Sequence, residues 1–174
     1  MQIGKPVLGI DAPPTPTVDL QHEAIREKLK YDSAIKGSAG WFFWIAGFSL
    51  FNSILVLFGT VRGTVVGLGT TLLVNTYAVR LGPIANVAAF VISATLSGVF
   101  VVFGVFARKQ EKWAFIAGMV LYALDTVVFF FFRNPALAVG FHCFVLFCLF
   151  GGLGAIDRKR QAEANLAEIS QAQS

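Results

Sequence analysis

Four long runs of apolar residues divide the chain, and a shorter fifth run lies between the first two. A helix rises about 1.5 Å per residue, so about 20 apolar residues cover the roughly 30 Å hydrocarbon core of a bilayer. Each long run meets that length, and the Asn134-Pro135 step forces a turn between the last two. The pattern predicts an all-α integral membrane protein with four transmembrane helices, at about residues 40–59, 84–107, 113–132 and 136–156.

The fifth run, residues 64–80, is too short to cross a bilayer by the same measure, with only about 16 residues between its flanking arginines. Thr64, Thr71 and Asn75 fall on one helical face. Polar groups at membrane depth are tolerated where protein shields them or where they line a wet cavity. We therefore expect a short re-entrant or interfacial helix here, with Asn75 and Arg80 as candidate gate residues at the non-cytoplasmic mouth.

Both ends of the chain are predicted to carry polar helical extensions. Residues 1–39 combine a proline-rich linker with a helix over about 17–36, in which acidic residues precede basic ones as the helix dipole favours. This helix lies either on the membrane surface or in solvent. Residues 157–174 are expected to continue the fourth transmembrane helix as a tail, with one apolar face made of Ala162, Leu166 and Ile169.

Composition agrees with a membrane protein. Hydrophobic residues make up 56% of the chain and charged residues 14%, which leaves too little polar surface for a soluble domain of 174 residues. The net charge of +4 does not indicate nucleic-acid binding, because the basic residues flank apolar runs and form no patch with aromatic residues.

The distribution of Lys and Arg predicts the topology. With four crossings, only Arg62, Arg80 and Arg133 fall on one side of the membrane. Ten basic residues fall on the other: Arg26, Lys28, Lys30, Lys36, Arg108, Lys109, Lys112, Arg158, Lys159 and Arg160. A fifth crossing would put the basic loop and tail outside, against the tendency of Lys and Arg to stay cytoplasmic. We expect a multi-pass protein of the inner or plasma cell membrane with both termini cytoplasmic.

Polar residues in the four spans are predicted to share one depth. Asn52, Asp125 and His142 each lie seven residues from the non-cytoplasmic end of their helices, or about 10 Å below it. Ser93, on the remaining helix, lies slightly deeper on a stripe of small and polar residues. Tyr122, one turn from Asp125, can add a hydroxyl group. These five residues are the candidate proton or ligand site.

Two interpretations of this polar layer remain open from the sequence. A carboxylate in hydrocarbon costs several kcal/mol unless it is neutralised or paired, which makes His142 the natural partner of Asp125. The layer then either hydrogen-bonds the bundle together or binds a proton, an ion or a small ligand.

No cofactor or metal is expected. His142 is the only histidine in a predicted span, which excludes a haem held by two intramembrane histidines. Cys143 and Cys148 fall on different helix faces and do not form a CxxC motif. The glycines of residues 63–69 resemble fragments of a nucleotide-binding loop, but the strand, the third glycine and the downstream acid are missing, so we assign them to close helix packing.

The sequence favours a non-enzymatic membrane protein, either an accessory subunit or a self-associating bundle. The main alternative is a minimal proton-coupled transporter or small-ligand carrier that uses Asp125 and His142. An intramembrane hydrolase has weaker support. The predicted spans contain Ser, His and Asp residues, but the chain has no recognisable oxyanion-hole segment. The expected partners are the lipid bilayer and either further copies of the chain or a larger membrane complex, and not nucleic acid.

Overall fold

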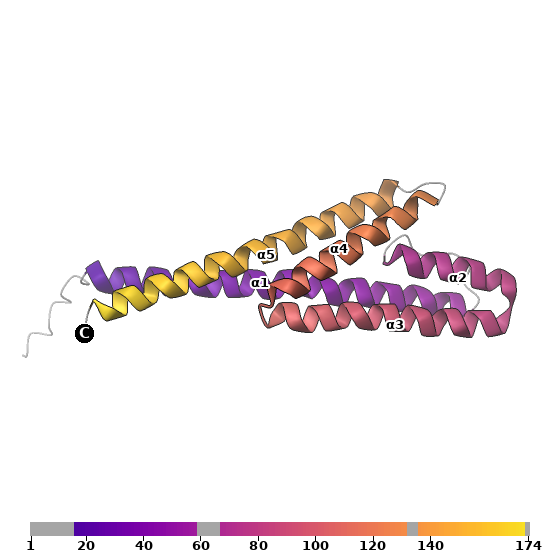
Figure 1. Ribbon diagram of the computed structural model, residues 1–174, viewed down its shortest axis with the longest axis horizontal. Coiled ribbons are helices and arrows are strands. Elements are labelled where there is room, and N and C mark those ends of the chain that lie inside the picture. Colours follow the sequence, from indigo (N-terminus) through magenta and orange to yellow (C-terminus); the bar gives the residue numbers. More distant parts are fainter. Residues whose placement is uncertain (1–15, 59–66, 132–135, 173–174) are drawn as a thin grey trace, which may run out of the picture.

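The structure is a computed structural model that describes residues 16–58, 67–131 and 136–172. Within these ranges the chain is all-helical, as the sequence predicted, and contains no strand. Figure 1 shows its elements. In chain order they are α1 (Pro16–Leu57), α2 (Gly69–Leu81), α3 (Pro83–Arg108), α4 (Lys112–Val128), the 3-10 helix η1 (Phe129–Phe131) and α5 (Ala136–Gln171).

Three helices, α1, α3 and α5, are long and apolar enough to cross a membrane. They coincide with three of the four predicted spans. The remaining predicted span corresponds to α4 followed directly by η1, and α4 alone has 17 residues. The long apolar helices of the described residues are therefore those of a membrane protein.

α1 is one continuous helix of 42 residues, where the sequence predicted two helices separated near residues 37–39. Each glycine inside a helix costs about 1 kcal/mol relative to alanine; Gly37 lies in the predicted break and Gly40 directly follows it. Ile35, Ala39 and Phe42, which interleave with them, are fully buried in the core. Burial of this face outweighs the cost of the glycines, so the helix does not break.

The two polar extensions pack against each other, which the sequence did not predict. The amino-terminal part of α1 and the carboxyl-terminal part of α5 lie side by side at one end of the molecule (Figure 1). Ala24 of α1 and Ala162 of α5 are both buried. Lys28 Nζ lies 3.2 Å from a carboxylate oxygen of Glu163. The ends of the chain thus form an antiparallel helix pair that continues the bundle.

Asp32 ties three segments together at the base of this pair. Its carboxylate accepts a hydrogen bond from Lys159 Nζ of α5 at 2.7 Å and pairs with Lys36 of α1 at 2.6 Å. It also accepts a longer bond of 3.4 Å from Gln110 Nε2, in the connection between α3 and α4. Close by in sequence, Lys112 of α4 pairs with Asp157 of α5. All three basic segments of the sequence therefore meet at one level of the bundle.

α2 and α3 form a helical hairpin. Gly82 joins them with φ of +104°, a left-handed conformation that glycine adopts readily, and Pro83 begins α3. The two helices run side by side in Figure 1, with α2 in the opening between α3 and the α4–α5 pair. Thr71 and Asn75 lie on the buried face of α2, as the sequence predicted for a shared face, whereas Thr64 lies outside the described residues.

The inward stripe of α3 is also as expected, since Ser93, Ser97 and Gly104 are buried. A Cβ atom at Gly104 would lie 2.8 Å from the ring of Phe43 and 3.2 Å from Phe42 Cβ, so glycine lets α1 and α3 approach closely here. The run of four phenylalanines at residues 129–132 does not face outward along its whole length. Phe129 is 2% exposed, whereas Phe130 is 68% exposed. Phe129 lies seven residues after Tyr122 and so shares its inward face, whereas Phe130 falls on the outward side.

Salt bridges to Lys159 and Lys36 lower the pKa of Asp32, which precedes the apolar part of α1, from 3.8 to about 2. Because this pKa is lower in the folded state, the carboxylate stabilises the fold above about pH 4, and the contribution is lost as the pH falls through about 2. We expect Asp32→Asn to lower the free energy of unfolding by about 0.2–1 kcal/mol at pH 7. Thermal unfolding of both proteins in detergent from pH 7 to 2 should show the difference vanish at the acidic end.

Glu27→Gln is the matched control, because Glu27 is an exposed carboxylate on the same helix, outside its first turn, and has no ion pair among the described residues. This variant should unfold like the wild type at every pH. A difference between wild type and Asp32→Asn that stayed constant down to pH 2 would contradict the assignment.

Candidate functional site

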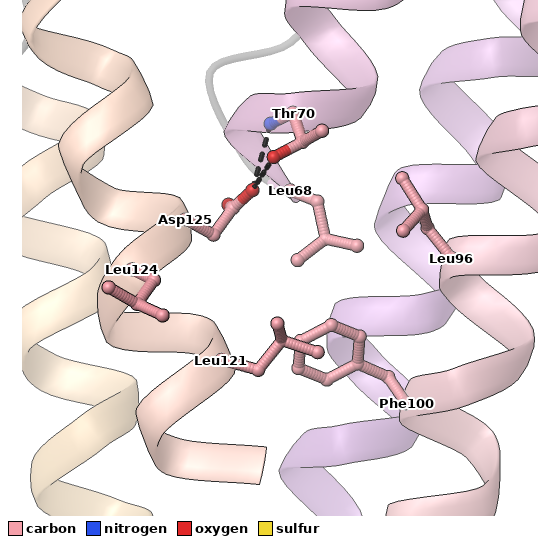
Figure 2. Close-up of a pocket in the computed structure, with 7 residues that line it drawn as sticks. All are labelled: Leu68, Thr70, Leu96, Phe100, Leu121, Leu124 and Asp125. Carbon is pink, nitrogen blue, oxygen red and sulfur yellow. Dashed lines mark hydrogen bonds between the residues drawn. The ribbon is translucent and has the colours of Figure 1, made fainter. Parts of the chain in front are cut away.

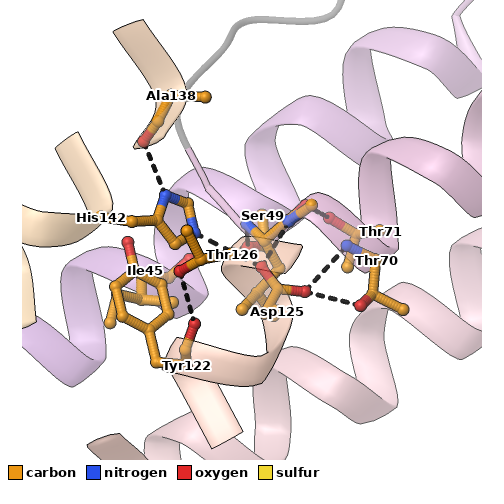
Figure 3. A network of polar contacts seen from close by, with 11 residues as sticks. Ile45, Ser49, Thr70, Thr71, Tyr122, Asp125, Thr126, Ala138 and His142 are labelled. Atoms are coloured by element: carbon orange, nitrogen blue, oxygen red, sulfur yellow. Dashed lines mark hydrogen bonds and ion pairs between the residues drawn. The ribbon is translucent and has the colours of Figure 1, made fainter. Parts of the chain in front are cut away.

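Asp125 lies on the inward face of α4, one turn after Tyr122 and one turn before Phe129. All three side chains are buried, and Asp125 is 7% exposed. Their spacing follows the i, i+3, i+7 rule for one face of a helix. The carboxylate of Asp125 points to the first turn of α2 (Figure 3).

The carboxylate accepts three short hydrogen bonds from that turn. Its Oδ2 atom accepts from the backbone N–H of Gly69 at 2.6 Å. Its Oδ1 atom accepts from the backbone N–H of Thr70 at 2.8 Å and from the Thr70 hydroxyl at 2.6 Å. Both carboxylate oxygens are therefore occupied by donors from α2.

These bonds make Asp125 a cap supplied by another helix. The first N–H groups of any helix lack partners within the helix, and Leu68, the residue at the cap position of α2, provides no side-chain bond to them. A carboxylate at this end also interacts favourably with the positive end of the helix dipole. Asp125 thus satisfies the N–H groups of Gly69 and Thr70 and balances the partial positive charge at the start of α2.

His142 lies on α5 against the other side of Asp125, with no exposed surface. Its Nδ1 atom lies 2.9 Å from the carbonyl oxygen of Ala138, which can only accept, so Nδ1 carries a proton. Its Nε2 atom lies 3.4 Å from Asp125 Oδ2, a long contact. In the neutral ring with a proton on Nδ1, Nε2 has no proton to donate. A hydrogen bond from Nε2 to the carboxylate therefore requires the imidazolium form.

Aromatic rings enclose this pair. The ring of Tyr122 stacks on His142 with 4.2 Å between centroids and 12° between planes. The ring of Phe129 meets His142 nearly edge-on at 4.8 Å. The Tyr122 hydroxyl, which the sequence suggested as part of the polar layer, has no hydrogen-bond partner among the described residues. Tyr122 contributes a ring surface to the site and no hydroxyl bond.

The residues before α2 attach to α1. The backbone N–H of Leu68 donates to Ser49 Oγ at 2.8 Å, and Ser49 Oγ donates to the carbonyl of Ile45 at 2.9 Å. Gly67 has φ of +124°, and a Cβ atom there would lie 3.2 Å from the backbone nitrogen of Ser49. The Gly67-x-Gly69 pattern therefore serves a close approach of backbone to its neighbours, as expected from the sequence.

The structure places some of the predicted site residues in contact with one another and others in different surroundings. Asp125, His142 and Tyr122 are in mutual contact. Asn52 is buried beside Gly67, with its Nδ2 atom 3.3 Å from where a Cβ atom would lie. Ser93 is fully buried on α3, and its hydroxyl makes no hydrogen bond to another described residue.

The two predicted gate residues differ in environment. Asn75 is buried and its Nδ2 atom donates to Ser53 Oγ at 2.9 Å, which ties α2 to α1. Arg80 is exposed in the last turn of α2. Asn75 is therefore part of the packing between helices, and Arg80 alone of the two lies on the surface.

Sequence analysis missed the donors Gly69 and Thr70 and the acceptor Ser49. One available signal was the Gly-Thr-Thr sequence at residues 69–71, since Ser and Thr are common where helices begin. No sequence pattern, however, indicates that the cap of α2 comes from a residue 56 positions away along the chain.

A cavity of about 160 Å³ lies beside the carboxylate, between α2, α3 and α4 (Figure 2). Leucine and phenylalanine side chains form most of its wall, and the polar groups that reach it belong to Thr70 and Asp125. The described residues contain no cluster of His, Cys, Asp and Glu that could hold a metal ion.

Gly69→Ala tests the approach of α2 to Asp125. A Cβ atom at this position would lie 2.7 Å from a ring carbon of Phe129 and 3.1 Å from the Asp125 carbonyl oxygen. We expect the variant to push the first turn of α2 away from the carboxylate and to lower the melting temperature in detergent. Gly140→Ala is the control, because its Cβ atom meets nothing within 4 Å and alanine favours a helix. Equal melting temperatures for the two variants would contradict the close approach.

Comparison with known proteins gives no relative from which a role could be transferred. The chain matches no family model, no curated protein and no solved structure.

Proposed function

We propose that the chain is a non-enzymatic protein of the inner or plasma cell membrane that crosses the bilayer four times, with both termini cytoplasmic. α4 and η1 together run from Lys112 to Phe131, about 30 Å at the rise of a helix, which suits the fourth crossing. The bonds of Asp32 to Lys159 and Gln110 join the three basic segments at one level. That meeting supports their lying on the same, cytoplasmic side.

In this arrangement α2 is a re-entrant helix. Its amino terminus binds Asp125 within the bundle, and its carboxyl terminus adjoins the start of α3. A helix lying flat in the interface would have its first N–H groups available to water. Those of α2 are bound to a carboxylate that is nearly buried, which supports the re-entrant reading over the interfacial one.

The hydrogen bonds of the Asp125 carboxylate are the observation on which we choose between a structural role and a transport role. Three donors from α2 and the contact with His142 use both carboxylate oxygens, as expected of a residue that fixes a helix in position. Beside the site, the rings of Phe42, Phe100 and Tyr122 are fully buried and fill the interior. We therefore propose that Asp125 and His142 hold the bundle together and that the protein acts through its outer surface.

The outer surface has features suited to contacts with other helices. Gly98 of α3 is exposed, and a Cβ atom there would meet nothing, so this face permits close approach of another helix. Gly118 of α4, by contrast, is already covered by Phe42. These observations support an accessory subunit or a self-associating bundle.

His142 also argues against a hydrolase. In a Ser/His/Asp triad one imidazole nitrogen faces the acid and the other faces the serine hydroxyl. Here Nδ1 faces the carbonyl of Ala138 and Nε2 faces Asp125, so neither nitrogen is directed to Ser93.

A proton-coupled carrier is the second candidate, and one observation favours it. The Asp125 carboxylate holds α2 through its negative charge, so protonation would weaken the grip on the helix. The 160 Å³ cavity lies next to that carboxylate. In this proposal α2 would move when Asp125 is protonated, and Asn75 and Arg80 would lie at the non-cytoplasmic mouth.

Asp125→Asn and His142→Ala distinguish the two candidates. An amide at position 125 turns one acceptor into a donor facing the N–H groups of α2, which costs about 1–3 kcal/mol. We expect both variants to melt at lower temperature in detergent, and wild-type proteoliposomes to show no pH-dependent flux beyond that of empty vesicles. Native mass measurement should find assemblies larger than one chain of 18.8 kDa.

A wild-type flux that disappears in both variants while they stay folded would overturn the structural role and favour the carrier. A monodisperse single chain after gentle extraction, without any co-purified protein, would overturn the accessory or self-associating role. Thr95→Ala is a suitable control for both measurements, because the Thr95 hydroxyl is exposed and bonds only its own helix.

Topology is tested by labelling single cysteines in a variant in which Cys143 and Cys148 are replaced. A membrane-impermeant maleimide added from outside intact cells should label Arg80→Cys, because Arg80 is exposed at the end of α2. It should not label Gln110→Cys until the membrane is permeabilised. Labelling of position 110 from outside would contradict the four-crossing topology.

A further inference from the structure

A groove of about 310 Å³ runs between α1 and α5, away from the Asp125 site. Its α1 side includes Lys30 and Tyr31, and its α5 side includes Phe150, Gly151 and Arg158. The volume falls at the lower end of the ~300–1,000 Å³ range of small-ligand sites. The groove therefore has room for part of a small amphiphilic molecule.

The two cations of the groove differ from their neighbours by lacking an acidic partner. Lys28, Lys36 and Lys159 each pair with a carboxylate. Lys30 and Arg158 are exposed and make no ion pair with any described residue. They line one groove from two helices, so an anion between them would have two positive neighbours and would displace no existing partner.

The groove changes character along its length. Phe150 precedes Arg158 by eight residues, or about 12 Å along α5 in the direction of the apolar part of that helix. Arg158 follows directly after Asp157, which pairs with Lys112 at the level of the basic segments. One end of the groove is therefore cationic, and the other is apolar.

Glycines leave the apolar end open. A Cβ atom at Gly151 or at Gly154, which also lines the groove, would meet nothing within 4 Å. Phe150 is 67% exposed beside them. An extended hydrocarbon chain can lie along such a glycine floor in contact with the phenylalanine ring.

We propose that this groove binds one anionic phospholipid of the cytoplasmic leaflet. Lys30 and Arg158 contact the phosphate group, and an acyl chain lies along Phe150, Gly151 and Gly154. Basic pockets between helices on the cytoplasmic side are suited to anionic headgroups. A soluble anion would use the cations but not the apolar floor, which is why the groove fits a lipid. The leaflet assignment rests on the proposed topology.

The test counts bound lipids on the full chain in detergent by native mass spectrometry, with phosphatidylglycerol and phosphatidylcholine of equal chain length. We expect phosphatidylglycerol to bind more tightly. The double variant Lys30→Gln/Arg158→Gln should weaken that binding about 30-fold, the effect of two interfacial cations. The control Arg26→Gln/Arg160→Gln removes the same charge from the same two helices outside the groove, at exposed residues with no ion pair among the described residues, and it should retain wild-type binding.

A second variant, Gly151→Leu, fills the apolar end without changing charge, and it should also lose phosphatidylglycerol binding while melting like the wild type. If the control double variant lost phosphatidylglycerol binding to the same extent, the effect would come from net charge alone, and the proposed site would be wrong. Competition by glycerol phosphate as effective as by the whole lipid would overturn the role of the acyl chain. Because binding in detergent is independent of sidedness, a reversed topology would leave the result intact and would alter only the leaflet.

Discussion

The amino terminus of α2 lies inside the bundle, where its first N–H groups meet a nearly buried carboxylate. An unsatisfied backbone donor in such surroundings costs several kcal/mol, so a helix can begin there only if another part of the protein accepts its hydrogen bonds. Asp125 accepts them from Gly69 and Thr70, and Ser49 accepts the bond from Leu68. Gly67 and Gly69 permit the close approach that brings these groups together.

A buried carboxylate is costly, and so is a buried helix terminus, but each offsets the other here. Asp125 has donors on both oxygens, and the N–H groups of Gly69 and Thr70 have acceptors. His142 completes the surroundings from α5, and the stacked ring of Tyr122 keeps it enclosed. The α2, α4 and α5 helices are thus joined through one residue, which explains how a helix of 13 residues can stay between longer ones.

The sequence predicted the parts of this arrangement that depend on helical period and length. Apolar runs indicated the long helices, and equal depth along them indicated that Asp125 and His142 would meet, which they do. The other partner of the Asp125 carboxylate is the first turn of α2. Its position depends on how the chain folds back after α1, and the local sequence pattern carries no information about that. The continuity of α1 was missed for a related reason. Its glycines predict a break, and only contacts with α5 and α3 keep the helix intact.

α1 and α5 each pass from the polar helix pair into the apolar bundle without interruption, as Figure 1 shows. A continuous helix bends only gently unless proline, a Gly/Ser pair or a bulge intervenes. Within α1 and α5, no proline follows Pro16. A displacement applied to the outer pair, by a protein bound there, would therefore pass along two unbroken helices. Ser49 on α1 and His142 on α5 lie on these helices, and bending of α1 on the way to Ser49 would be concentrated at Gly37 and Ser38.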